Sequence, residues 1–145
     1  MKPTLKYWAI AALLGGCQCS SSDPTPAPRL LDIHWALVQI DATPLAVSSY
    51  HDDSNSYIQF TAAGNRMQGL ATCDVIQGQF ALGTSSNQLT ISQVSTIKGS
   101  CTSPFIGPQY LAALPQINRY EISGGMLRLY DAQAAQPRLV FQAAP

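Results

Sequence analysis

The apolar residues after position 29 mostly follow the two-residue period of β-strands. In residues 31–37 they occupy every second position, from Leu31 to Leu37, with polar or small residues between them. Shorter segments that we interpret as strands follow at 57–60, 66–73, 78–82, 88–91, 95–101, 119–122, 126–130 and 139–142. Turn residues bound most of these segments, as is typical of strands that bury one face. The pattern therefore predicts a series of short antiparallel strands.

One segment has the helical period instead. In residues 108–117, four apolar side chains are spaced near 3.6 residues apart: Tyr110, Leu111, Leu114 and Ile117. Pro108 suits the first turn of a helix, where its missing N–H would have no partner, and Pro115 limits the helix length. Evenly spaced strands with one late helix predict a mostly β (α+β) fold. We expect a compact antiparallel sheet, closed or nearly closed, with the helix covering part of it.

The first 16 residues have the features of a targeting signal. Lys2 and Lys6 precede an uncharged apolar run at 7–14, which is shorter than the roughly 20 residues that a bilayer core requires. Such a run suits a signal peptide. It ends in Leu14-Gly15-Gly16-Cys17, the pattern of a bacterial lipobox. We therefore expect cleavage after residue 16 and a membrane anchor of diacylglycerol and palmitate on Cys17. The alternatives are a buried core helix and an ordinary secretory signal with a chance cysteine.

A tether follows the predicted anchor. Residues 18–28 are rich in Ser and Pro and lack apolar periodicity, so we expect an extended, solvated segment. Gln18 follows Cys17, and the absence of Asp at this position favours the outer membrane of a Gram-negative cell, with the domain in the periplasm. The sequence thus predicts a signal peptide at 1–16, a lipidated tether at 17–29 and one folded domain at 30–145.

Composition and charge exclude some classes of protein. Apolar residues make up 46% of the 145 residues, which supports a packed core and argues against disorder of the whole chain. Removal of residues 1–16 would leave six basic against eight acidic residues, a net charge of −2. The remaining basic residues are scattered and form no stripe that would bind phosphates. Binding to nucleic acid is therefore not expected.

The chain has four cysteines, at positions 17, 19, 73 and 101. Cys73 and Cys101 are the expected disulfide pair, because both fall in the folded part and export would place them in an oxidising compartment. Their bridge would close a loop of roughly 30 residues and contribute on the order of 3–4 kcal/mol to stability. Buried free thiols are the alternative, whereas a metal site would need further ligands close by. Cys19 is left in the tether, either free or cross-linked to a partner.

Short motifs between residues 35 and 142 occur in a recognisable order. They are Trp35-Ala-Leu37, Pro44, Ile58-Gln-Phe60, Gly64, Met67-Gln-Gly69-Leu-Ala-Thr-Cys73-Asp74, Gly78-Gln-Phe80, Leu89-Thr-Ile91, Thr96, Cys101, Tyr110-Leu-Ala-Ala-Leu114, Tyr120-Glu-Ile122 and Leu127-Arg-Leu129. In this series the chain resembles the META domain family, which includes the HslJ-type heat-shock lipoproteins of bacteria. The resemblance implies a compact antiparallel β fold with one helix, an envelope location and an association with stress or drug tolerance. It implies no catalytic residue.

The chain departs from the family pattern at two places. Thr72-Cys73-Asp74 stands where the family usually has Gly-Cys-Asn, and the interval from Thr96 to Cys101 is one residue longer than usual. Asp74 can replace Asn in capping a turn, since either side chain can accept a backbone N–H. A functional role that requires the amide of that Asn would be missing from this chain.

Little in the sequence points to catalysis or to a bound metal. His34 and His51 are the two histidines, and no serine lies in a Gly-x-Ser-x-Gly motif that would supply a nucleophile. The polar loop at 51–55 has oxygen ligands that suit Ca²⁺ but fits no EF-hand, so it is better interpreted as a solvated loop. Gly124-Gly125 suits a hairpin turn rather than a phosphate loop. We expect no catalytic residue, no cofactor and no metal site.

The aromatic residues divide into two predicted groups. The side chains that fall on apolar phases are expected in the core: Trp35, Phe60, Phe80 and Phe141. Three tyrosines are the candidates for an exposed recognition surface: Tyr50, Tyr57 and Tyr130.

Three functions follow as hypotheses. The first is a non-enzymatic envelope lipoprotein that binds a protein or other envelope component, in stress or envelope maintenance. The second is a small-ligand carrier. An internal cavity of roughly several hundred Å³ would favour this hypothesis. The third is a small hydrolase that uses His51 and Asp53. A serine within hydrogen-bond reach of His51 would favour this hypothesis. A packed interior with an exposed apolar or Tyr-rich patch would favour the first.

Overall fold

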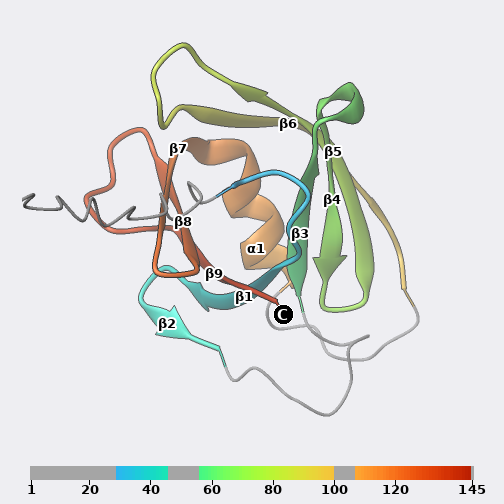
Figure 1. The fold of residues 1–145 in the computed structure, drawn as a ribbon. Coiled ribbons are helices and arrows are strands. Elements are labelled where there is room, and N and C mark those ends of the chain that lie inside the picture. The colour runs from blue at the N-terminus through green and yellow to red at the C-terminus, as the bar shows by residue number, and fades with distance from the viewer. Residues whose placement is uncertain (1–28, 46–55, 100–106, 145) are drawn as a thin grey trace, which may run out of the picture.

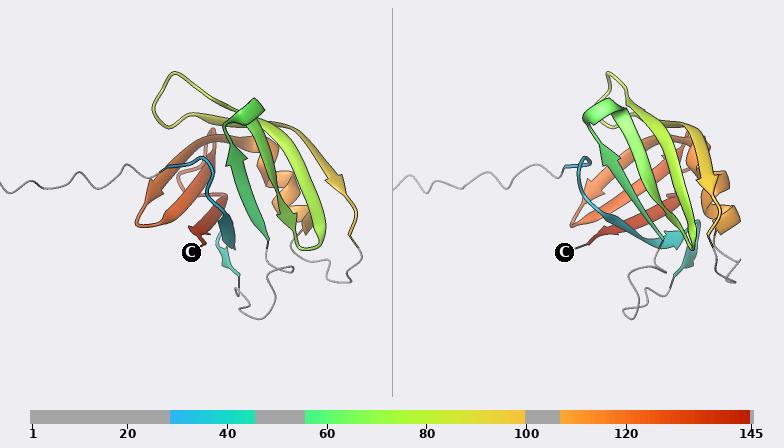
Figure 2. Two further views of the ribbon diagram at one scale, coloured as in Figure 1. Left: turned by 45° about the vertical axis from the view of Figure 1, so that its right-hand side comes forward. Right: turned by 90° about the vertical axis from the view of Figure 1, so that its right-hand side faces the viewer.

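The strands form one antiparallel sheet that curls around a short helix (Figures 1 and 2). This computed structural model describes residues 29–45, 56–99 and 107–144. The predicted signal peptide and Cys17, nearly all of the tether, Tyr50, the loop at 51–55 and Cys101 lie outside the described residues.

Within residues 29–45, 56–99 and 107–144, short strands are combined with three helical segments. The strands are β1 (Trp35–Ile40), β2 (Thr43–Pro44), β3 (Tyr57–Thr61), β4 (Arg66–Ala71), β5 (Asp74–Leu82), β6 (Leu89–Ile97), β7 (Ile117–Ser123), β8 (Met126–Asp131) and β9 (Leu139–Ala143). The helical segments are the 3₁₀ turns η2 (Ala63–Asn65) and η3 (Leu114–Gln116) and the helix α1 (Gly107–Ala113).

The strand order makes the sheet a half-barrel. The order is β6-β5-β4-β3-β1-β9-β8-β7, with β2 paired to β1, and all pairings between these strands are antiparallel. The two edges approach each other at one end, where Gln88 bridges Arg119 and the Tyr120 N–H donates to the Asn87 carbonyl at 2.9 Å. The predicted fold class is confirmed: the chain is mostly β, with a curled antiparallel sheet and one helix.

Large apolar side chains fill the interior of the half-barrel. The largest fully buried ones are Trp35, Tyr110, Phe60, Phe141, Ile58, Met67, Ile76, Leu89, Leu114, Leu127, Leu129 and Leu139. Phe60 and Phe80 meet edge to face, with ring centroids 5.2 Å apart, which is a favourable geometry for aromatic pairs. The prediction that Trp35, Phe60, Phe80 and Phe141 pack in the core is confirmed.

The helix closes over this core through its buried face. Tyr110 and Ala113 are fully buried, and so is Leu114 in the following 3₁₀ turn. The Tyr110 hydroxyl donates to the Tyr57 carbonyl of β3 at 3.1 Å, and its ring lies 6.0 Å from that of Phe141 in β9. The predicted covering helix is therefore present, although α1 ends at Ala113 and the chain enters β7 at Ile117.

The first predicted strand is shorter than its alternating pattern suggests. Regular pairing begins at Trp35, because Asp32 has a left-handed backbone with φ of 60° that turns the chain. The preceding residues still touch the sheet: Leu31 bridges Phe60, and the Asp32 N–H donates to the Phe60 carbonyl at 2.8 Å. Leu30 is buried and Leu31 and Ile33 pack on the core, so the apolar period reflects burial without a continuous strand.

The predicted strand at 88–91 and residues 95–97 of the one predicted at 95–101 belong to a single strand; residues 100 and 101 lie outside the described residues. β6 runs from Leu89 to Ile97 and contains a bulge, where Gln93 has φ of 52° and the register with β5 shifts. A bulge adds one residue to one strand and so reverses the alternation after it. The alternating apolar pattern of this one strand therefore appears in the sequence as two separate segments.

The turn from β4 to β5 holds a threonine in an unfavourable backbone conformation. Thr72 has φ of 62°, and its Oγ1 is buried without a hydrogen-bond partner in the described structure. A β-branched residue is rarely found at positive φ, whereas glycine adopts it readily. The family resemblance leads to the expectation of glycine at this position.

Replacement of Thr72 by glycine is expected to raise the free energy of unfolding by about 1 kcal/mol. Relief of backbone strain of about 1–3 kcal/mol would outweigh the entropic penalty of glycine, about 0.5–1 kcal/mol. The Thr72 N–H, which donates to Ser56 Oγ at 2.9 Å, is retained. Urea denaturation measures the change. Thr90→Gly in β6 is the control and should destabilise; equal destabilisation by both variants would contradict the role of strain.

The predicted hairpin near the C-terminus is confirmed. β7 and β8 pair up to Ser123 and Met126, and Gly124 and Gly125 form the turn with φ of 58° and 75°. Two consecutive positive φ values are what the favoured two-residue hairpin turn requires.

Candidate binding surface on the outer face of the sheet

The outer face of β3–β6 carries ordered rows of side chains. Alternation places Ile58 and Phe60 in the core, and therefore turns Tyr57 and Gln59 outward. The register aligns Gln59 with Gln68, Gln68 with Gln77, and Gln77 with Ser95. We call these four residues the amide row. Within it, Gln68 Nε2 donates to Gln59 Oε1 at 3.2 Å.

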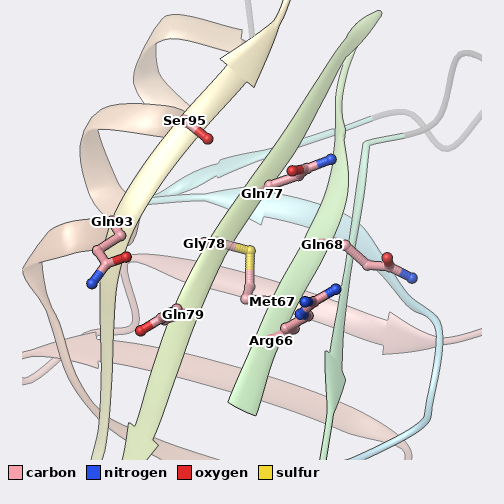
Figure 3. Close-up of a pocket in the computed structure, with 8 residues that line it drawn as sticks. All are labelled: Arg66, Met67, Gln68, Gln77, Gly78, Gln79, Gln93 and Ser95. Atoms are coloured by element: carbon pink, nitrogen blue, oxygen red, sulfur yellow. The ribbon is translucent and has the colours of Figure 1, made fainter. Parts of the chain in front are cut away.

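A shallow groove of about 360 Å³ lies beside the amide row. Its lining consists of Arg66, Met67, Gln68, Gln77, Gly78, Gln79, Gln93 and Ser95 (Figure 3). Gly78 has no side chain, and a Cβ there would lie 2.8 Å from the terminal carbon of Met67. The bulge turns the backbone at Gln93 along one wall. The groove thus offers amide donors and acceptors and one guanidinium, which suit hydrogen bonding to a polar chain.

An apolar row runs next to the amide row. The register aligns Tyr57 with Leu70, Leu70 with Val75, and Val75 with Ile97. We call these four residues the apolar row. Val75 is 40% exposed and Ile97 is 60% exposed, whereas Tyr57 and Leu70 are half-buried. The exposed His34, just before β1, stacks on the Tyr57 ring with centroids 4.0 Å apart and adds an aromatic ring beside the row.

Asp74 fixes the end of β6 beside the apolar row. Its Oδ1 accepts the Gly99 N–H and its Oδ2 accepts Lys98 Nζ, each at 3.0 Å. The Gly99 hydrogen bond, and then the Lys98 ammonium, lower the pKa of the Asp74 carboxyl. Asp74 was predicted to accept a backbone N–H, and it does so. The donor is Gly99, which lies beyond β6 and not in the turn next to Asp74.

The structure separates the predicted recognition tyrosines. Tyr57 lies on the outer face as part of the apolar row. The prediction that Tyr130 is exposed is wrong: it is 7% exposed, because the Arg119 guanidinium of the neighbouring strand lies 3.8 Å from its ring centroid. Its hydroxyl donates to Glu121 at 3.2 Å. Tyr50, His51 and Asp53 lie outside the described residues.

The described residues bring together neither a metal site nor a membrane helix. His, Cys, Asp and Glu side chains do not gather there in groups of three or more that would hold a metal ion. Within the same ranges, none of the helices has the length and apolar character that a bilayer crossing requires. Cys73 is disulfide-bonded and lies in the turn after β4. Because Cys101 lies outside the described residues, the pairing of these two cysteines stays a prediction.

The two rows were not predicted from the sequence, although a signal for one of them exists. Gln59, Gln68 and Gln77 are spaced nine residues apart. Each lies on the polar phase of its strand, and the short turns between the strands place them side by side. A repeated amide at matching phases is the pattern that would have predicted the amide row.

Comparison with known proteins agrees with this architecture. A family model for the META domain matches residues 28–145. The NMR structure of a protein from Burkholderia xenovorans superposes with a TM-score of 0.61, at 22% identity, over 79% of this chain and 83% of that chain. A crystal structure of a DUF4847 family protein from Bacteroides vulgatus has a TM-score of 0.43, at 18% identity, over 61% of this chain and 57% of that chain. None of the curated proteins that were compared matches. Because the family model matches residues 28–145, which are most of the chain, the chain belongs to the META domain family.

Proposed function

We propose that this protein is a non-enzymatic lipoprotein of the bacterial envelope whose domain binds another envelope component. In this proposal a lipid on Cys17 holds the chain in the outer membrane and the domain lies in the periplasm. A stress-related role in envelope maintenance is the corresponding cellular function. The binding surface is the outer face of β3–β6, with its apolar and amide rows.

The apolar row is the observation that carries this proposal. Single exposed apolar side chains are ordinary on a protein surface, but a row across four neighbouring strands presents a continuous patch. Val75 and Ile97 are the most exposed members of the row, and they are direct cross-strand partners. The amide row borders this patch with polar groups, and Arg66 lies one outward position beyond the amide row on β4. An apolar centre with a polar rim is the usual composition of a protein–protein interface.

The packed interior supports a binding module over a ligand carrier with a pocket inside the barrel. Trp35, Tyr110 and Phe141 are each fully buried inside the half-barrel. The space that a carrier would use is therefore occupied by side chains. The third hypothesis, a hydrolase, depends on His51 and Asp53, which lie outside the described residues. The other histidine, His34, stacks on Tyr57.

A pair of charges in the apolar row is expected to weaken partner binding strongly. Val75→Glu together with Ile97→Glu would place two carboxylates opposite each other in the interface, and the capture of partners should fall at least about tenfold, equivalent to about 1.4 kcal/mol or more. The measurement is quantitative cross-linking and pull-down from intact envelopes.

The chain offers a matched control for this variant. Ala81 and Thr90 are exposed cross-strand partners on the same two strands, so Ala81→Glu with Thr90→Glu adds the same charges away from the apolar row. The control should keep its partners. A Cys17→Ser chain, together with the intact mass of the native protein, tests the anchor separately. Equal loss from both double variants, or retention by both, would refute the proposed surface.

A further inference from the structure

A second cleft lies at the end of the half-barrel where its two edges approach. The segment before β1, residues 29–34, crosses this end between β7–β8 and β3 (Figure 1). The cleft has a volume of about 510 Å³ and is bounded by this segment, by Leu82 at the end of β5 and by Tyr120 of β7. Such mouths of β-barrels are frequent sites of ligand binding.

Two backbone hydrogen bonds hold the crossing segment and β7, two walls of this mouth cleft, in place. The Asp32 N–H donates to the Phe60 carbonyl at 2.8 Å and fixes the crossing segment. The Tyr120 N–H donates to the Asn87 carbonyl at 2.9 Å, which joins β7 to the loop that follows Leu82. The cleft is therefore formed by ordered parts of the fold.

The lining of the mouth cleft is predominantly aliphatic. Leu30, Leu31 and Ile33 contribute side chains that pack on the core, and Tyr120 adds an aromatic wall. Leu82 is 47% exposed, although it is a large apolar residue. A chain of methylene groups would cover these side chains and remove them from water. Two charged residues, Arg29 and Asp32, also line the cleft. Arg29 comes first along the chain, and its guanidinium is the group that would attract an anion.

The position of the cleft along the chain indicates the source of such a methylene chain. Arg29 lines the cleft, and only residues 18–28 separate it from Cys17. Twelve residue steps extend to at most about 40 Å. On the proposed function, on which this step rests, the cleft is thus held within reach of the bilayer that carries the anchor.

We propose that the mouth cleft binds an acyl chain of an anionic phospholipid from that bilayer, with the phosphate at Arg29. This binding would hold the domain at the membrane surface in one orientation and leave the outer face of β3–β6 available to a partner. The groove and the cleft have separate linings, so the two sites would act independently.

Photo-cross-linking of the native protein tests this proposal. The protein is reconstituted in phosphatidylglycerol vesicles that contain a phospholipid with a diazirine on one acyl chain, and labelled residues are mapped by mass spectrometry. We expect labels at Leu31, Ile33 and Leu82. Leu82→Gln, which makes the cleft polar, and Leu82→Trp, which fills it, should each reduce the cleft labels at least fivefold. Ala81→Gln introduces the same amide at an exposed position of β5 that lies outside the cleft lining; it is the control and should not reduce them.

Further arms distinguish failure of the cleft from failure of the anchor. Intact mass and flotation with vesicles report whether Cys17 carries lipid. A water-soluble short-chain phospholipid with the same diazirine tests the cleft without a bilayer. Absence of cleft labels with both probes overturns the proposal, as do labels that neither Leu82 variant reduces. Cleft labels from the soluble probe alone, on a protein that floats, overturn the bilayer as the source. Cross-links from the cleft to a protein would likewise replace the lipid as its occupant.

Discussion

Tyr110→Ala is expected to lower the free energy of unfolding by about 3–5 kcal/mol, the usual effect of deleting a large buried ring. Tyr110 is fully buried and is the residue through which α1 reaches both halves of the sheet. Its hydroxyl donates to the Tyr57 carbonyl in β3, and its ring lies against Phe141 in β9. Deletion of the ring would therefore leave a cavity at the place where the helix joins the two halves.

Tyr110→Phe separates the hydroxyl from the ring. It should cost about 1 kcal/mol, because it removes one buried hydrogen bond and retains the packing. Urea denaturation at constant m-value measures both variants. Tyr120→Phe is the control: its hydroxyl lies 3.5 Å from the Ser86 carbonyl in an exposed contact, and its loss should change stability by less than about 0.5 kcal/mol. Equal effects of the two phenylalanine variants would refute the role given to the Tyr110 hydroxyl.

Tyr110 also makes stability sensitive to alkaline pH. Burial, and then the proximity of Tyr57, raise the pKa of the Tyr110 phenol well above its usual value of 10.0. The folded state therefore retains this proton where the unfolded state releases it. The resulting stability is fully present below the unfolded pKa and is lost as the pH rises from about 10 toward the folded pKa. Tyr110→Phe should remove this part of the alkaline loss of stability.

Strands were predicted correctly from the sequence where buried and exposed residues alternate without a break. In β3 and β4 the buried residues alternate strictly, and both strands were located within two residues. The pattern failed where the backbone takes a positive φ at a residue that is not glycine, as at Asp32 and Gln93. Gln rarely takes such a conformation, and Asp32 stands within an unbroken alternating pattern. The first strand was therefore predicted to begin four residues before β1, and β6 was divided.

Exposure could not be predicted where it depends on a neighbouring strand. Tyr130 was expected at the surface, but its cross-strand partner Arg119 covers the ring. The apolar row is the opposite case, because Tyr57 and Ile97 become members of one surface only through the register of four strands. The two-residue period of a strand shows which face of the sheet a side chain occupies. The register between strands determines which side chains are neighbours on that face.

The mouth cleft and the apolar row lie on different sides of this small domain, so each could contact a different molecule. The mouth cleft lies where the chain from the predicted anchor enters the fold, and the apolar row lies on the outer face of β3–β6. A tethered domain that used both would face the bilayer with one and a partner with the other. Cross-linking to lipid and to protein should therefore respond to different substitutions.

Gly69→Ala is expected to destabilise the fold by about 1–3 kcal/mol or more, although it adds only one methyl group. Gly69 lies in β4 opposite Ile58, and its Cα faces the interior. A Cβ at this position would meet the Tyr57 carbonyl oxygen at 2.2 Å, a distance that only a shift of the backbone would relieve. The same oxygen accepts the hydrogen bond from Tyr110. Movement of β3 away from β4 would therefore also weaken the attachment of the helix.

A second glycine provides the control for this effect. At Gly107, at the start of α1, a Cβ would lie 3.6 Å from its nearest neighbour, the Ala71 carbonyl oxygen, which is an ordinary contact. Gly107→Ala should therefore be neutral or slightly stabilising, because alanine loses less backbone entropy than glycine on folding. Urea denaturation compares the two variants, and a double variant Gly69→Ala with Tyr110→Phe tests their coupling. If the carbonyl of Tyr57 links the two sites, the double variant should lose less stability than the sum of the single variants. Strict additivity would mean that β3 accommodates the methyl group without disturbing the helix.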